Sequence, residues 1–325
     1  MVIRVVVFME YKEQLDTWVK EFRTYTKEGK VADYIPALKK ADPSHFGICI
    51  LGPDGVKWES GEYAVPFTMQ SISKIISFIS ACISLGIEDV LRKVDVEPTG
   101  DAFDSIIRLE VHRQGKPFNP MINAGALTVA SILPGETPDE KFQIIQNLMV
   151  EMLSRQPVIN MGVFESEWRT ANRNRALAYY LMETGYLEAE VDEALEVYLK
   201  HCSIEVTLED LATIGLILAY DGYHPLQGKR IFSKEIARLT KAIMVTCGMY
   251  NASGRFAAFV GLPAKSGVSG GIMCSMPPRL RSKEMPFRNG CGIGIYGPAI
   301  DEYGNSAAGV QLLRQLSEEW DFNIF

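Results

Sequence analysis

The chain has 325 residues, of which 47% are apolar, and this is enough for a large hydrophobic core in one or two domains. The formal charge is −7 and no run of basic residues is longer than two, so charge does not indicate a nucleic-acid partner. No uncharged apolar stretch is long enough to cross a membrane as a helix. The six cysteines form no CxxC pair, so we expect a cytoplasmic protein with reduced thiols.

The N-terminal segment divides into two parts. Residues 1–9 are apolar apart from Arg4 and lack a small-residue cleavage site, so we expect a strand or a loose terminus instead of a signal peptide. In residues 10–29, apolar side chains recur at helical spacing, and Gly29 is a typical helix end. This part is predicted to be an amphipathic helix.

A loop and a hairpin are predicted next. Residues 31–36 predict the loop, in which Tyr34 would ordinarily be a packing residue. Segments 47–51 and 56–60 flank Pro-Asp-Gly at 53–55, and this turn composition between two strand-like segments predicts a β-hairpin.

Residues 66–74, with the sequence PFTMQSISK, open a strongly apolar run. Apolar residues then recur at helical spacing up to position 87, which predicts a buried helix. Pro66 and Thr68 stand where a helix start favours a proline and a small polar cap. Ser71 and Lys74 are three residues apart, so they would share one face of the first turns.

The Ser71–Lys74 pair is a candidate nucleophile with its base. A serine hydroxyl becomes reactive when a base takes its proton, and burial lowers the pKa of a lysine towards this role. Unpaired backbone N–H groups at a helix start would suit a developing oxyanion. The plain alternative is a capping serine beside a solvated lysine. The uncharged apolar run after Lys74 argues against it, because it places the lysine on a buried helix.

A long helical region follows. Residues 116–126 predict an irregular loop that leads into a helix, with Asn123 as a simple cap. In the polar segment 165–174, one continuous helix would place Glu167 and Asn174 on one face, although a solvated helix entrance explains the segment equally well. Helical spacing and helix-start residues predict helices near 140–154, 174–184, 190–201, 211–220 and 233–246.

The last part of the chain returns to strands. We expect a loop at 248–254, a glycine-rich strand at 263–273, another strand at 291–297 and a helix from 305 onward. Glycines inside a strand usually mark the close approach of another backbone. The terminal strands must pair with the early hairpin, because an isolated hairpin is not stable.

The predicted fold class is therefore α+β: an antiparallel sheet flanked by N- and C-terminal helices, with an inserted helical subdomain. Residues 10–65 and 247–325 would form the α/β part, and residues 66–246 would form the helical part. Ser71 would then lie at the junction of the two parts, where ligand sites tend to form, within one catalytic unit.

Two motifs resemble the serine β-lactamases and penicillin-binding proteins. They are Ser-x-x-Lys at Ser71 and Lys-Ser-Gly at 265–267, whereas the middle Ser-Asp-Asn motif of that group is absent. A closer resemblance is to the glutaminase family, the serine-dependent type shared by bacteria and mitochondria. It extends from about residue 15 to the end, on segments 31–36, 66–74, 119–126, 172–181, 202–207, 247–250 and 261–271.

The resemblance implies hydrolysis of L-glutamine to L-glutamate and ammonia without a metal or an organic cofactor. It also implies that Ser71 is the nucleophile, Lys74 its base and Tyr250 a second proton-transfer group, with the backbone of Ser71 and Val268 as oxyanion hole. The implied substrate ligands are Asn123, Glu167, Asn174 and Tyr198, with Tyr34 and Gln70 lining the pocket.

Two other functions are open at this stage. One is another serine hydrolase or amidase of the β-lactamase-like fold, and the other is a glutamine sensor without catalysis. The resemblance further implies that the protein forms a homodimer or homotetramer. The expected binding partner is a small-molecule substrate, L-glutamine, and neither a nucleic acid nor a membrane.

Overall fold

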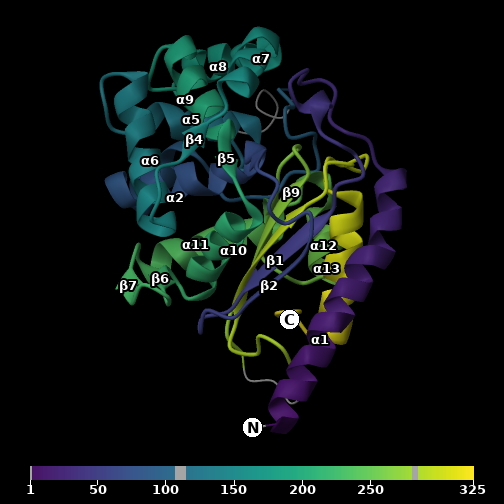
Figure 1. The fold of residues 1–325 in the computed structure, drawn as a ribbon. Coiled ribbons are helices and arrows are strands. Elements are labelled where there is room, and N and C mark those ends of the chain that lie inside the picture. Colours follow the sequence, from purple (N-terminus) through teal and green to yellow (C-terminus); the bar gives the residue numbers. More distant parts are fainter. Residues whose placement is uncertain (1, 107–114, 280–284) are drawn as a thin grey trace.

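The central sheet joins strands from both ends of the chain. In the computed structural model, which describes residues 2–106, 115–279 and 285–325, it contains five antiparallel strands in the order β2-β1-β10-β9-β8 (Figure 1). The early hairpin pairs with the terminal strands through β1 and β10, as predicted. The strands are β1 (Gly47–Leu51), β2 (Lys57–Gly61), β8 (Ala264–Ser266), β9 (Gly271–Met276) and β10 (Cys291–Tyr296).

Helices cover both faces of this sheet. The long α1 (Val2–Phe22) and α13 (Ala307–Glu319) lie on one face, and α10 (Leu208–Ala219) lies on the other (Figure 1). Side chains alternate along β1 accordingly. Ile48 and Ile50 pack in the cluster that contains α1 and α13, whereas Cys49 and Leu51 pack in the cluster that contains α10. The predicted α+β class, with terminal helices flanking an antiparallel sheet, is confirmed.

Glycines in β10 allow α10 to approach the sheet closely. A Cβ atom added at Gly292 would collide with the carbonyl oxygen of Ala212, and one at Gly294 would collide with the first turn of α10. No larger residue fits at either position unless the helix moves. This is the close backbone approach that glycines inside a strand indicate.

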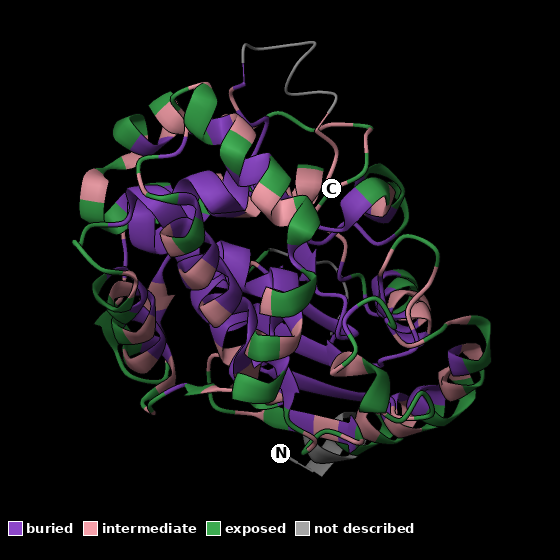
Figure 2. Cartoon of the chain, turned by 90° about the horizontal axis from the view of Figure 1, so that it is seen from above, coloured by how far each residue is buried: buried purple, intermediate pink, exposed green. Residues whose placement is uncertain are grey.

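The other helices gather mainly beside the sheet. Figure 2 shows buried residues turned towards a common interior, and the apolar residues of most of these helices form one cluster with the α10 face of the sheet. The helix at 253–259 differs, because its Phe256 packs in the cluster that contains α1 and α13. The division into residues 10–65 with 247–325 and residues 66–246 stays a prediction. The helices are α2 (Ser73–Leu85), α3 (Ile87–Lys93), α5 (Asn123–Ile132), α6 (Pro138–Leu153), α7 (Met161–Thr170), α8 (Asn172–Glu183), α9 (Val191–Cys202), α11 (Lys234–Cys247) and α12 (Ser253–Phe259).

Short strands hold the segment that precedes α2. β3 (Phe67–Thr68) pairs with β5 (Ile204–Val206), which also pairs with β4 (Val158–Ile159). A 3-10 turn, η3 (Gln70–Ile72), then leads directly into α2. The prediction that Pro66 and Thr68 start the helix is therefore wrong, because Thr68 belongs to the strand that pairs with β5.

The first residues form a helix, so the prediction of a strand or loose terminus at 1–9 is wrong for residues 2–9. Several valines favour a strand by propensity. However, extension of an existing helix adds one hydrogen bond per residue without a new nucleation cost. The 3-10 segment η1 (Arg23–Glu28) then carries the chain to Gly29, where the predicted end is confirmed.

Two C-terminal predictions also need correction. Residues 263–273 are not one strand but parts of β8 and β9 joined by a tight turn, in which the Gly267 N–H donates to the Gly271 carbonyl and Gly270 has φ = +96°. The expected loop at 248–254 contains the 3-10 turn η4 (Tyr250–Ala252) and the start of α12.

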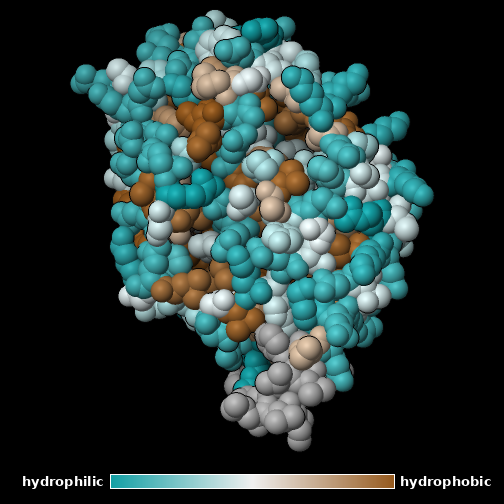
Figure 3. Space-filling view, viewed as in Figure 1, coloured by the Kyte–Doolittle hydropathy of each residue, from teal (hydrophilic) through white to brown (hydrophobic). Residues whose placement is uncertain are grey.

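A small separate hairpin, β6 (Tyr223–His224) with β7 (Lys229–Arg230), follows α10. On the face seen in Figure 3, the apolar side chains form scattered patches on a mainly hydrophilic surface. Within the described parts of the chain, no helix is both long and apolar enough to span a membrane.

Candidate active site

Ser71 lines a cavity of about 150 Å³ and has 8% of its surface exposed. The residue before it, Gln70, has φ = +49°, a left-handed conformation that is uncommon outside glycine. Other walls of the cavity come from the β8–β9 turn, from four helices and from two loops. The residues in these walls include Val268, Asn123, Glu167, Asn174, Tyr198, Tyr34 and Phe103. The cavity therefore lies where the sheet meets the helical part.

Lys74 is fully buried in the first turn of α2. Its Nζ donates to the Asn123 Oδ1 at 2.7 Å and to the Met121 carbonyl at 3.1 Å. Burial lowers the pKa of Lys74 to about 8, against a smaller opposite effect of nearby acidic groups such as Glu167. The alternative of a solvated lysine is therefore wrong. Among the described residues, no hydrogen bond joins Lys74 to Ser71 directly.

Glu167 supplies a buried carboxylate to the cavity. Only 9% of the residue is exposed, and its Oε1 accepts a hydrogen bond from Gln70 Nε2 at 2.8 Å. Burial raises the pKa of Glu167 to about 7, and the hydrogen bond from Gln70 and the charge of Lys74 act in the opposite direction. A positively charged group bound in the cavity would therefore be stabilised by the Glu167 carboxylate. The alternative of a solvated helix entrance does not describe this residue.

Three polar side chains meet beside Lys74. The Asn123 Oδ1 also accepts from the Tyr198 hydroxyl at 3.2 Å, and the Asn123 Nδ2 donates to Asn174 Oδ1 at 2.9 Å. The prediction that Asn123 is a simple helix cap is wrong, because Ile122 is the capping residue of α5 and the Asn123 side chain turns into the cavity.

A break at Ala171 separates α7 from α8, so residues 165–174 are not one continuous helix.

Tyr250 lies in η4 with φ = +52° and is 91% buried. Burial raises the pKa of its hydroxyl well above the usual range, while the Ser71 hydroxyl and the Val268 N–H lie close enough to oppose that shift. The hydroxyl has no hydrogen-bond partner of ordinary geometry among the described residues. It is thus a buried proton donor or acceptor that lies beside Ser71.

Lys265, like Lys74, is fully buried, and the sequence placed it in a motif but not in the predicted site. Its Nζ lies 4.4 Å from the centre of the Tyr250 ring and donates to the Ser266 carbonyl at 2.6 Å. Burial, reinforced by the charge of Lys74, lowers the pKa of Lys265 well below its usual range. The Lys-Ser-Gly motif was the signal that could have added it to the predicted site.

Residues at the cavity mouth complete the lining. Tyr34 is 54% exposed there, so it is not the ordinary packing tyrosine that its type favours. Arg173 and Asp104 also line the cavity, and the Arg173 Nε donates to the Asp104 carbonyl at 3.0 Å. Arg173 stands inside the polar segment 165–174, but no sequence motif marked Asp104.

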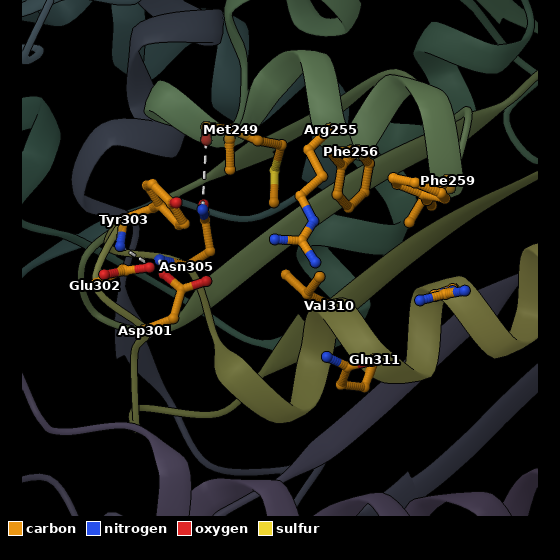
Figure 4. A pocket seen from close by; sticks show the side chains of 13 residues that line it. Met249, Arg255, Phe256, Phe259, Asp301, Glu302, Tyr303, Asn305, Val310 and Gln311 are labelled. Atoms are coloured by element: carbon orange, nitrogen blue, oxygen red, sulfur yellow. Dashed lines mark hydrogen bonds between the residues drawn. The ribbon is translucent and has the colours of Figure 1, made fainter.

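A second cavity, of about 230 Å³, lies near Met249, the residue before Tyr250 (Figure 4). The Asn305 side chain donates to the Met249 carbonyl there, and Arg255 and Phe256 of α12 form part of the wall. Although it is larger, none of the predicted site residues lines it. The predicted site residues therefore gather at the cavity of Ser71 and not at this one.

The described residues contain no group of three or more histidine, cysteine, aspartate or glutamate side chains that could hold a metal ion. The functional groups at the Ser71 cavity are instead hydroxyl, amine, amide and carboxylate groups. This set suits an acyl transfer to serine with a zwitterionic substrate held by its charged ends.

Comparisons with known proteins agree with this chemistry. The glutaminase family model matches residues 29–325. Glutaminase 2 of Bacillus anthracis is 63% identical over 311 residues, which are 96% of this chain and 95% of that protein.

Solved structures give the same result. The crystal structure of a probable glutaminase of Bacillus subtilis is 59% identical with a TM-score of 0.92, over 98% of each chain. A Bacillus subtilis glutaminase in covalent complex with 5-oxo-L-norleucine, formed by reaction with 6-diazo-5-oxo-L-norleucine, is 57% identical with a TM-score of 0.88. That match covers 96% of this chain and 99% of the other. The chain therefore belongs to the glutaminase family.

Proposed function

We propose that this enzyme, an amidohydrolase that converts L-glutamine to L-glutamate and ammonia, works through a glutamyl ester on Ser71. The observation that carries the proposal is the position of Ser71, three residues before the fully buried Lys74 in the first turn of α2, on a cavity that also holds the Glu167 carboxylate. The covalent 5-oxo-L-norleucine complex of the Bacillus subtilis relative supports a nucleophilic residue that attacks a glutamine-like ligand.

In the first half of the cycle, the Ser71 oxygen attacks the side-chain amide carbon of glutamine. Its proton passes to the neutral amine of Lys74, directly or through the Tyr250 hydroxyl. The backbone N–H groups of Ser71 and Val268 stabilise the oxyanion. The C–N bond then breaks, the transferred proton goes to the leaving nitrogen, and ammonia departs.

In the second half, water attacks the ester carbon and gives its proton to the same base. The bond between the carbon and the Ser71 oxygen breaks, the serine recovers a proton, and glutamate leaves. A lysine with a pKa of about 8 suits both halves, because it is partly neutral at pH 7 to 8 and can take and return a proton.

The cavity walls support an assignment of the substrate ends. Glu167 is the buried carboxylate in the wall that would pair with the α-ammonium group, and Gln70 orients it through the 2.8 Å hydrogen bond. The amides of Asn123 and Asn174 and the hydroxyl of Tyr198 would donate to the α-carboxylate. Tyr34 would cover the mouth. That the reaction needs neither a metal nor an organic cofactor stays a prediction.

The test uses 6-diazo-5-oxo-L-norleucine on wild type and on Ser71→Ala. Wild type should lose activity and gain the mass of one 5-oxo-norleucyl group, with dinitrogen released, and peptide mapping should place it on Ser71. Ser71→Ala should remain unlabelled, keep its fold by circular dichroism, and lose about 10⁴-fold or more in kcat. Label on another residue, or a tenth of wild-type activity in pure Ser71→Ala, would contradict the proposal.

We also infer a homodimer or homotetramer in the cytoplasm. Large apolar side chains that remain exposed on α7 and α8, namely Met161, Tyr179 and Met182, support self-association. All six cysteines are free, which supports a reducing compartment. Light scattering coupled to gel filtration, on wild type and Tyr179→Glu, tests the assembly; a wild-type monomer would contradict it.

A further inference from the structure

A buried hydrogen-bond chain lies behind Ser71, outside the cavity. Ser73, fully buried at the start of α2, has its Oγ 2.6 Å from the Gln70 carbonyl oxygen and 2.6 Å from His201 Nδ1. His201 lies on α9 and is also fully buried. Neither Ser73 nor His201 lines the cavity. Ser73 stands inside the segment 66–74 but received no role from the sequence, and His201 lies outside the motifs found there.

The protons in this chain can be assigned from its geometry. The Gln70 carbonyl can only accept, so the single hydroxyl proton of Ser73 points to it. The Ser73 oxygen must then accept from His201, which requires the tautomer with a proton on Nδ1. Burial lowers the pKa of His201 to about 3, so the ring is neutral and Nε2 carries no proton. The Nε2 has no partner among the described residues, and a buried acceptor without a partner is less costly than a buried donor.

The end of the chain is the backbone that presents Ser71. The Gln70 carbonyl accepts from both the backbone N–H and the hydroxyl of Ser73. Gln70 needs such support, because its φ of +49° is unfavourable for a residue with a side chain and persists only where the surroundings fix it. Its side chain is fixed separately by the bond to Glu167. Ser71 follows directly, so its N–H and hydroxyl directions depend on the Gln70 backbone.

We propose that Ser73 and His201 are positioning residues for glutamine hydrolysis: the hydrogen bonds from His201 to Ser73 and from Ser73 to Gln70 hold the left-handed backbone from which Ser71 reacts. The inference rests on the proposed role of Ser71. A misplacement of about 1 Å at a reacting group can cost about 100-fold in rate. Loss of the chain should therefore lower kcat roughly 10- to 100-fold.

The test compares matched variants by kcat and KM for glutamine. Ser73→Ala and His201→Leu should each lower kcat at least tenfold, and the double variant should be scarcely worse than either, because the two groups act as one unit. His201→Asn, whose amide N–H can replace the Nδ1–H, should recover most of the rate. Ser80 is a buried serine on the same helix, and its hydroxyl has no hydrogen-bond partner among the described residues, so Ser80→Ala should stay within twofold of wild type.

The shape of the pH profile should not change in these variants, since neither Ser73 nor His201 titrates in the working range. Melting temperatures distinguish a variant that is unfolded from one that is folded but has a displaced Ser71. If Ser73→Ala does not fold, the comparison of His201→Asn with His201→Leu tests the positioning role instead. Additive losses, equal rates for Asn and Leu at position 201, or a Ser73→Ala rate within twofold of wild type would overturn the inference. An active Ser71→Ala would instead overturn the nucleophile assignment.

Discussion

The Asn123 Oδ1 accepts a hydrogen bond from Lys74 Nζ at 2.7 Å, so a residue assigned to substrate binding also contacts the residue assigned as the base. The same oxygen accepts from the Tyr198 hydroxyl. If Asn123 binds the substrate as proposed, substrate binding and the protonation state of Lys74 are coupled through one amide. The neutrality of that amide matters, because it adds no charge that would favour the ammonium form of the lysine.

Asn123→Asp should raise the pKa of Lys74. A carboxylate within hydrogen-bond distance of an amine typically shifts its pKa by about 1–3 units, so the alkaline rise of kcat/KM, expected near pH 8 in wild type, should move upward by at least one unit. Activity at pH 7 should fall roughly tenfold or more. Asn174→Asp serves as the control, since Asn174 contacts Lys74 only through Asn123 and should give a smaller shift. An unchanged profile in Asn123→Asp would contradict the role of Lys74 as base.

Lys74→Ala should be nearly as damaging as Ser71→Ala, and the double variant should be scarcely worse, because a nucleophile and its base act as a unit. Tyr250→Phe keeps the ring over Lys265 but removes the hydroxyl beside Ser71, so it should also lower kcat severely. Measured kcat values for the singles and the double decide the point. Additive losses at positions 71 and 74 would mean that the lysine is only structural.

Glu167→Gln should weaken both binding and rate. Loss of the counter-charge for the α-ammonium group should cost about 2–4 kcal/mol in kcat/KM. In wild type, kcat/KM should fall as the pH drops below about 7, because the carboxylate that binds the ammonium becomes protonated there. This acidic inflection should be absent in Glu167→Gln. Its persistence would assign the inflection to another group.

The same substitution makes a stability prediction of defined sign. Burial raises the pKa of Glu167 in the folded state from 4.5 to about 7, so its ionisation opposes folding and stability is lost as the pH rises through that range. Glu167→Gln should therefore melt higher than wild type at pH 8 and show little of this advantage at pH 4. Scanning calorimetry at the two pH values provides the measurement. An advantage that is equal at both would contradict the buried, shifted carboxylate.

Short-range patterns accounted for much of the fold. The hairpin at β1 and β2 follows from its turn residues, and the helix after Ser71 follows from its apolar spacing, because both depend on neighbours in the sequence. The start of that helix did not follow. Thr68 is typical of a cap, but pairing with β5, more than 130 residues away, keeps it in a strand.

The site was predicted in two ways. Ser71 and Lys74 were found from their spacing and the uncharged run, which are local. The contacts of Gln70 with Glu167, and of Lys74 with Asn123, join residues 97 and 49 positions apart, so only the family resemblance could assign them. The left-handed backbone at Gln70 had no sequence signal at all, because nothing in a glutamine favours positive φ.

The last prediction concerns the choice between glutamine and asparagine. If Glu167 holds the ammonium group and Asn123, Asn174 and Tyr198 hold the carboxylate, the distance from these anchors to Ser71 is fixed by the cavity. Asparagine is shorter by one carbon–carbon bond, about 1.5 Å. Its amide carbon would then fall short of Ser71, and a misplacement near 1 Å already costs about 100-fold.

We therefore expect kcat/KM for asparagine to be at least 100-fold below that for glutamine. α-N-Acetylglutamine, which keeps the full chain length but has no ammonium group, should also be a poor substrate of wild type. In Glu167→Gln the penalty for acetylation should shrink, because the charge that it leaves unpaired is already gone, whereas the penalty for asparagine should persist, because it depends on length. Measuring kcat/KM for the three substrates on both proteins separates charge from reach. Asparagine within tenfold of glutamine, or an acetylated substrate as good as the free one on wild type, would show that the α-group anchors are misassigned and that the cavity recognises little beyond the amide itself.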